Sequence, residues 1–95
     1  MKHHKSREIE SAFTAKGFQK KEGGNHTKFV FYYMGKPTLA HTFLSRGTAD
    51  PGEPNLHKMK KQLFFNNSND FDQFIECTFT EQDYITNLKS KGIIA

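Results

Sequence analysis

The sequence predicts an α+β fold in which a three-stranded antiparallel sheet carries helices on one face, followed by a C-terminal helical extension. Three observations predict it. Apolar residues recur at helical spacing near the N-terminus and again after residue 54, and the segment between them alternates apolar and polar residues. Glycine-rich turns interrupt that alternating segment. The length of 95 residues suits one small domain, and packing the helices on one face of the sheet is the economical arrangement.

Composition narrows the class of protein. The chain is 35% hydrophobic, with ten Phe and three Tyr but no Trp, so the core is expected to consist of aromatic rings. No apolar run approaches the ~18–20 residues of a membrane span, and no apolar stretch follows the charged N-terminus as in a signal peptide. The single cysteine, Cys77, excludes an internal disulfide and is expected to be buried. We therefore expect a cytoplasmic protein without a membrane segment.

The first helix is expected to begin at Ser6, as its N-cap, and to end at Gly17. Its apolar face consists of Ile9, Ala12 and Phe13. A glycine in the left-handed conformation after a helix commonly brings the flanking apolar residues together, so Phe13 and Phe18 are expected to touch.

Three strands are expected between residues 18 and 45. The first covers residues 18–21, and after a turn at residues 22–25 the second runs from about His26 to Met34. Gly35-Lys36 is typical of a two-residue hairpin loop, so Met34 is expected opposite Pro37, at the start of a third strand over residues 37–45.

This register assigns the two faces of the sheet. The core face is expected to carry Phe29, Phe31 and Tyr33 opposite Thr42, Ala40 and Thr38. The other face is expected to carry His26, Lys28, Val30 and Tyr32 opposite Ser45, Phe43, His41 and Leu39. His41 would then lie ~13 Å from His26, too far to share one proton transfer. The rings on this face are expected to be covered by residues 66–95 or by a partner, with base stacking as the alternative.

The second helix is expected to begin at Pro54-Asn55, with Asn55 as its cap, and to bury Leu56, Met59 and Leu63. A break at residues 66–69 separates it from two more helical pieces. The first has Phe71, Phe74 and Ile75 at helical spacing, and the second follows a capping-box pattern from Thr80 to Asp83. We divide the chain into a domain of residues 1–65 and an extension of residues 66–95 packed on it.

Charge is distributed unevenly along the chain. The whole chain has a net charge of +4. Residues 1–65 contain twelve Lys and Arg against five Asp and Glu, a net charge of +7, whereas residues 66–95 contain two against five, a net charge of −3. A small domain this basic indicates an anionic partner, most commonly nucleic acid. The acidic extension either shields that basic surface or enlarges the core.

The order helix, strand, strand, strand, helix is the layout of the double-stranded-RNA-binding-domain fold. At this point the chain resembles the HicA toxins of type II toxin–antitoxin systems, small ribonucleases with that fold. The resemblance lies in Lys5-Ser6-Arg7-Glu8-Ile9 leading to Gly17-Phe18, in Gly24-Asn25-His26-Thr27-Lys28-Phe29, in the hairpin through Gly35, and in the Leu- and Lys-rich segment of residues 56–63.

The resemblance covers residues 5 to about 65, and residues 66–95 have no counterpart in the family. It implies an endoribonuclease, an mRNA interferase, that cleaves mRNA without a metal or cofactor and is neutralised by a HicB-like antitoxin. His26 would be the catalytic histidine, delivered by a turn of Gly23, Gly24 and Asn25. The family's usual Gly-Ser before the histidine is replaced by this Gly-Gly-Asn sequence.

The chemistry of RNA cleavage suits these residue types. Histidine titrates near neutrality and can move a proton from the 2′-hydroxyl, while neighbouring lysines hold the phosphate. The lysines expected to bind RNA are Lys20, Lys21, Lys28, Lys58 and Lys61. The sequence does not identify a second proton carrier, although His57 at the start of the second helix could approach the site. The scattered histidines lack metal-ligand spacing. The alternative is a noncatalytic RNA-binding or protein-interaction module on the same fold, and a homodimer also remains open.

Overall fold

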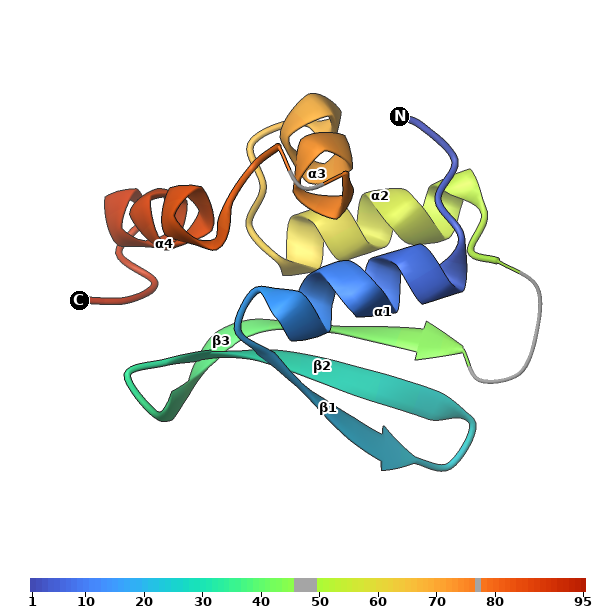
Figure 1. Cartoon of the computed structure of the whole chain (residues 1–95), viewed down its shortest axis with the longest axis horizontal. Helices are drawn as coiled ribbons and strands as arrows, with labels where there is room; N and C mark the ends of the chain where they lie inside the picture. The colour runs from blue at the N-terminus through green and yellow to red at the C-terminus, as the bar shows by residue number, and fades with distance from the viewer. Residues whose placement is uncertain (46–49, 77) are drawn as a thin grey trace.

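The computed structural model describes residues 1–45, 50–76 and 78–95, and within them the chain forms one sheet and a set of helices (Figure 1). Their bounds are α1 (Ser6–Ala15), β1 (Phe18–Gly23), β2 (His26–Tyr33), β3 (Lys36–Ser45), α2 (Glu53–Gln62), α3 (Ser68–Ile75) and α4 (Glu81–Ser90). The strands form an antiparallel sheet in the order β1-β2-β3. The predicted α+β fold is confirmed. The expected burial of Cys77 and part of the expected loop, residues 46–49, lie outside the described residues.

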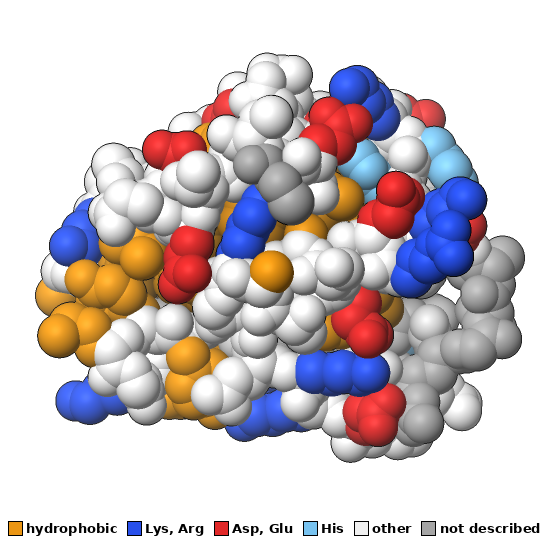
Figure 2. Space-filling view, viewed as in Figure 1, with side chains coloured by type: hydrophobic (Ala, Val, Ile, Leu, Met, Phe, Trp, Pro, Cys, Tyr) orange, Lys and Arg blue, Asp and Glu red, His pale blue; other side chains and the backbone are white. Residues whose placement is uncertain are grey.

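All the helices lie on the same side of the sheet. Figure 1 shows α1 and α2 over one sheet face, α3 outside them, and α4 near the β2–β3 hairpin. The opposite face, which we call the open face, carries no helix in the described part of the chain. On the side seen in Figure 2, acidic and basic side chains are interspersed, and hydrophobic side chains gather at the end where α4 and the hairpin lie.

The predicted capping box from Thr80 to Asp83 is confirmed at the start of α4, whereas the predicted caps of α1 and α2 are wrong by one and three residues. Lys5 is the N-cap of α1, and its backbone N–H donates to the Glu8 carboxylate at 3.0 Å. Ser6 is the first helical residue, and its N–H donates to Oδ1 of Asp50 at 2.9 Å. In α2 the N-cap is Gly52, and Asn55 lies within the helix. Carboxylates satisfy the free N–H groups at the start of α1, so a serine cap is not required there.

The end of α1 follows the prediction. Gly17 has φ +92°, the left-handed region that favours glycine. A Cβ at this position would lie 2.8 Å from both the Phe31 ring and the Glu81 carboxylate. The rings of Phe13 and Phe18 stack with centroids 4.8 Å apart. Gly17 therefore both reverses the chain and allows α4 and the sheet to approach closely.

The predicted register holds at one end of the β2–β3 pair and fails at the other. The pairs from His26↔Ser45 to Val30↔His41 are confirmed. The turn, however, consists of Met34 and Gly35 rather than Gly35 and Lys36. Both turn residues have positive φ, 53° and 78°, as a type I′ hairpin requires.

An irregularity in β3, opposite the segment from Val30 to Tyr32, separates the part of the pair that follows the predicted register from the part that does not. Beyond it Tyr32 pairs with Pro37 and Tyr33 with Lys36, so the expected pairs with Leu39 and Thr38 are wrong. The Thr38 hydroxyl donates to the Phe31 carbonyl at 2.7 Å within this irregularity. Because it lies toward the hairpin tip, it leaves the pairing around His26 unchanged.

One aromatic cluster joins the sheet, α1 and the C-terminal helices. The Tyr84 ring of α4 lies 5.0 Å from Phe31 and 5.2 Å from Phe74, measured between centroids. The fully buried residues of the last 30 positions are Phe71, Phe74, Tyr84 and Leu88. They belong to the same core cluster as the residues of α1, the strands and α2. Residues 66–95 therefore enlarge the core on the helical side and do not shield the open face.

Polar contacts also attach this extension to the start of the chain. Nε2 of His4 lies 2.7 Å from Oδ1 of Asp72, and both side chains are almost fully buried. The backbone N–H of Lys2 donates to the other oxygen of Asp72 at 3.0 Å, and the ammonium of Lys2 pairs with Glu76 at the surface at 3.1 Å. The ammonium of buried Lys16 donates to the carbonyls of Phe74 and Phe79. Asp72 of α3 and Glu76 at its C-cap thus face the N-terminal segment.

The Asp72 contact should contribute far more to stability than the Glu76 contact. Asp72→Ala leaves the buried His4 and the Lys2 N–H without their acceptor, so we expect a loss of about 3 kcal/mol in the free energy of unfolding. Glu76→Ala removes only a solvent-exposed pair and should cost less than about 1 kcal/mol. Urea denaturation measures both, and equal losses would contradict this description of the N-terminal segment.

Tyr84 gives the protein a specific sensitivity to alkaline pH. Burial raises the pKa of Tyr84 above its ordinary value of 10.0. Its hydroxyl donates to the Leu63 carbonyl at 2.8 Å, so Tyr84→Phe should cost about 1 kcal/mol near pH 8. Above pH 10 the unfolded state ionises this group more readily than the folded state, which lowers wild-type stability by up to about 1.4 kcal/mol per pH unit.

The difference in unfolding free energy between wild type and Tyr84→Phe should therefore shrink as the pH rises from about 8 to about 11. Urea denaturation at several pH values measures this difference. A difference that stays constant over the whole range would show that the hydroxyl ionises as readily in the folded state as in the unfolded state.

Candidate functional site

His26 is the first residue of β2 and follows a tight turn. Gly23 ends β1 and pairs with His26 across the hairpin, so the turn itself consists of Gly24 and Asn25. Gly24 has φ +58°, in the left-handed region that glycine adopts more readily than other residues. The expected turn of residues 22–25 is shortened because β1 stays paired as far as Gly23. The His26 side chain is exposed.

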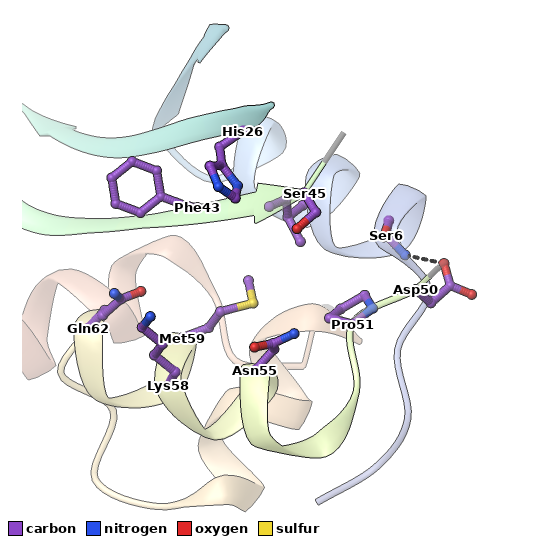
Figure 3. Close-up of a pocket in the computed structure, with 11 residues that line it drawn as sticks. Ser6, His26, Phe43, Ser45, Asp50, Pro51, Asn55, Lys58, Met59 and Gln62 are labelled. Atoms are coloured by element: carbon purple, nitrogen blue, oxygen red, sulfur yellow. Dashed lines mark hydrogen bonds between the residues drawn. The ribbon is translucent and has the colours of Figure 1, made fainter. Parts of the chain in front are cut away.

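A cavity of about 220 Å³ lies beside this histidine, between the start of β2, the end of β3 and one side of α2. Figure 3 shows His26 reaching from β2 over the end of β3, with the side chains of α2 on the opposite wall. The lining residues are Ser6, His26, Phe43, Leu44, Ser45, Asp50, Pro51, Asn55, Lys58, Met59 and Gln62. An imidazole and an ammonium group from distant parts of the sequence therefore share one cavity.

The position of the α2 wall follows from helical spacing. Leu56 and Met59 are buried against the core, and Leu63 is buried just beyond the last residue of the helix. The polar residues Asn55, Lys58 and Gln62 recur at intervals of three and four and lie along the cavity beside that apolar face. The Thr42 hydroxyl of β3 donates to Oε1 of Gln62 at 2.6 Å. This hydrogen bond fixes the distance between α2 and the edge of the sheet.

Phe43 joins the cavity to the open face. It lines the cavity, yet 43% of its surface is exposed. Its ring centroid lies 6.4 Å from that of His26 and 5.9 Å from that of His41. The ammonium of Lys28 lies 5.9 Å from the Phe43 centroid. The expectation that residues 66–95 cover this ring is wrong, because α3 and α4 pack on the other side of the sheet.

The five lysines expected to bind RNA occupy different surfaces. Lys21 and Lys28 pair with each other across β1 and β2 on the open face. The Lys21 ammonium lies 5.5 Å from the centroid of the Tyr32 ring. Lys58 lines the cavity, and Lys61 is exposed on α2 outside the lining. The site thus combines His26 with Lys58, and Lys28 lies nearby on the open face.

Lys20 is not part of this site. Its ammonium lies 3.2 Å from Glu10 of α1 and 3.6 Å from Glu22, on the helical side of the sheet. The hydrogen bond to Glu10 is the main cause that raises the pKa of Lys20. The alternation of side chains along β1 explains the outcome, because Lys20 and Lys21 must point to opposite faces.

The structure brings no second imidazole into the described lining of the cavity. His41 lies on the far side of Phe43, with Nδ1 2.9 Å from the Leu39 carbonyl. His57, which the sequence left as able to approach the site, lies 3.5 Å from Glu53 on its own helix and outside the described lining. His26 is therefore the one imidazole in the described lining of the cavity.

Two searches over the described residues give negative results. None of the helices found there has the length and apolar character needed to cross a membrane. Within the same residues, no group of three or more His, Cys, Asp or Glu side chains is arranged to hold a metal ion.

Most residues of the lining were not predicted as part of the site, among them Asp50. Asn55 was assigned as a cap, and Ser45 and Gln62 were not singled out, although all three line the cavity. The spacing of residues 55, 58 and 62 was the available signal, since it places them along one side of a helix. Nothing in the sequence showed that this side of α2 would face the end of β3.

A comparison of the sequence and fold with protein-family models, curated proteins and solved structures found no match.

Proposed function

We propose that this protein is an RNA-binding endoribonuclease that cleaves mRNA without a metal ion, with His26 as its proton-transfer residue. One observation carries the proposal: the exposed imidazole of His26 and the ammonium of Lys58 line the same cavity. An acid–base group beside a cation is the minimum that cleavage of a phosphodiester next to a 2′-hydroxyl requires. The resemblance of residues 5–65 to HicA toxins supports the same reaction.

The reaction needs only one protein group to move a proton. Neutral His26 accepts the proton of the 2′-hydroxyl as the 2′ oxygen forms a bond to phosphorus. The bond from phosphorus to the 5′ oxygen breaks, and that oxygen takes a proton from water. Lys58 stabilises the negative charge that develops on the phosphoryl oxygens. The expected products are a 2′,3′-cyclic phosphate and a 5′-hydroxyl end.

The polar wall of α2 supports the binding of a phosphate group. Asn55 and Gln62 offer amide groups on either side of Lys58, and the hydrogen bond from Thr42 holds Gln62 in place. Asp50 is the one carboxylate in the lining, and it accepts a hydrogen bond from the backbone of Ser6. One of its carboxylate oxygens therefore faces the start of α1.

The resemblance to HicA toxins also implies a biological role. By it, the nuclease acts as the toxin of a type II toxin–antitoxin pair, in the cytoplasm where mRNA is found, and a HicB-like antitoxin neutralises it. Co-purification with the product of an adjacent open reading frame, and growth rescue by that product, would support the role.

A noncatalytic RNA-binding or protein-interaction module is the second candidate. The exposure of Phe43 and Leu39 on β3 favours it, because exposed large apolar side chains commonly mark interaction surfaces. A homodimer through this strand is one form of that candidate. Cleavage assays separate the two functions.

His26→Gln should lower the rate of RNA cleavage by about 10²–10⁴-fold, because glutamine keeps hydrogen-bonding capacity but cannot transfer the proton. The assay is gel analysis of a long RNA in EDTA, with identification of the new ends. His57→Gln is the matched control, since it removes an exposed imidazole outside the cavity lining. Equal activity of wild type and His26→Gln would contradict the proposal, as would loss of wild-type cleavage in EDTA.

Lys58→Gln should reduce cleavage by about 10²-fold through loss of charge stabilisation. Lys61→Gln removes the same charge from the same helix outside the cavity and should change the rate by less than about threefold. If the two variants lose activity equally, Lys58 contributes only to the general positive charge of the domain.

A further inference from the structure

We propose that Phe43 forms a base-stacking subsite that holds an unpaired nucleotide beside the phosphate cleaved at His26. This inference rests on the proposed ribonuclease function and adds the form of RNA that the site accepts. Phe43 belongs to both surfaces that the substrate must touch, because it lines the cavity and stands exposed on the open face.

Neither neighbouring imidazole is stacked on the Phe43 ring, and a lysine ammonium lies over the ring, 5.9 Å from its centroid. The planes of His26 and His41 make angles of 70° and 88° with the plane of Phe43, so neither imidazole lies flat against it. The neighbours Thr42 and Leu44 are buried, and they hold the strand in place while Phe43 projects outward. A base that lies flat on this ring gains a stacking free energy similar to that at other aromatic side chains that bind single-stranded nucleic acid.

The charges of the open face favour a nucleic acid as the occupant. Among the residues of the three strands, the only carboxylate is Glu22, and it lies on the helical side beside Lys20. Lys21 and Lys28 lie on the open face, and the ammonium of Lys28 is close to the Phe43 ring. An aromatic ring flanked by cations binds a base and its phosphates together.

Stacking on the Phe43 ring requires an unpaired base, so the subsite favours single-stranded RNA. Figure 3 shows Phe43 next to His26 at the mouth of the cavity, with Lys58 across from them. A base inside a duplex is stacked on both sides and cannot lie flat on Phe43 without leaving the helix. The subsite therefore predicts cleavage in single-stranded regions, whereas the layout of the fold alone would suggest duplex RNA.

Phe43→Leu and Phe43→Tyr test the subsite as a pair. Leucine keeps an apolar side chain of similar size but has no ring, while tyrosine keeps the ring. The probe is a fluorescein-labelled, fully 2′-O-methylated oligoribonucleotide of mixed sequence, which has no free 2′-hydroxyl and cannot be cleaved. Its anisotropy reports binding as a single strand and as a duplex, and light scattering reports the oligomeric state of each variant.

We expect Phe43→Leu to weaken single-strand binding by about 5- to 100-fold and Phe43→Tyr by less than about twofold. Duplex binding should be weaker than single-strand binding and should not depend on Phe43. Leu39→Ala is the control for loss of exposed apolar surface, since Leu39 lies in the same strand and is 69% exposed. It should bind the probe as the wild type does.

Several outcomes would overturn the inference. These are unchanged single-strand binding by Phe43→Leu, equal dependence of duplex binding on Phe43, or a wild-type dimer that Phe43→Leu dissociates without any change in RNA binding. The last result would assign the surface to a second copy of the chain.

The test also separates this inference from the proposed function. If wild type cleaves RNA but Phe43→Leu binds the probe normally, the subsite fails and the nuclease stands. If Phe43 governs binding but no RNA is cleaved, the nuclease fails and the stacking subsite stands.

Discussion

The packing of aromatic rings on one face of the sheet is the constraint on which the rest of the structure depends. Phe29 and Phe31 of β2 are fully buried beneath the helices, and Phe18, Phe74 and Tyr84 close the same cluster from three other elements. Apolar surface of this size must be covered if so short a chain is to fold stably. The described helices therefore pack on one face of the sheet, and no described helix covers the other face.

The open face and the cavity are two consequences of that arrangement. Side chains alternate along a strand, so the burial of Phe29 obliges Lys28 and Val30 to point the other way. Val30 is nevertheless buried on that face, where it pairs with Gln19 and His41. Because Leu56 and Met59 are buried, α2 packs against the edge of β3. Lys58 of α2 therefore lines the same cavity as His26. The proposed chemistry thus arises from elements that are positioned by the core.

The C-terminal extension takes part in the same core. Tyr84 and Phe74 contact the rings of the first 65 residues, and Asp72 holds the buried His4. Two of its five acidic residues make contacts on the helical side, Asp72 with His4 and Glu76 with Lys2. The open face, which carries Lys21 and Lys28, lies on the other side of the sheet.

The elements and the two faces of the sheet could be predicted from the sequence because they depend on local patterns. The alternation in β2, the helical spacing of Phe71 and Phe74, and the glycine at position 17 each fix a local structure. The hairpin was misplaced by one residue because Met34 adopts a positive φ, which is uncommon outside glycine, asparagine and aspartate.

The site was only partly predictable for a different reason. The exposure of His26 follows from its turn and strand position, but the approach of Lys58 depends on how α2 packs against β3. Lys20 was expected in the site, yet Glu10 of α1 binds it on the opposite face. Contacts between elements far apart in the chain depend on tertiary packing, and no local pattern encodes them.

The most direct test of the central claim is to observe where RNA touches the protein. An NMR titration of the isotope-labelled chain with a single-stranded 2′-O-methylated oligoribonucleotide would follow side-chain signals of His26, Phe43 and Lys58 together. We expect the largest chemical-shift changes at these three residues, with little change along α3 and α4. Changes confined to the helical side of the molecule, with the His26 signals unmoved, would contradict the account.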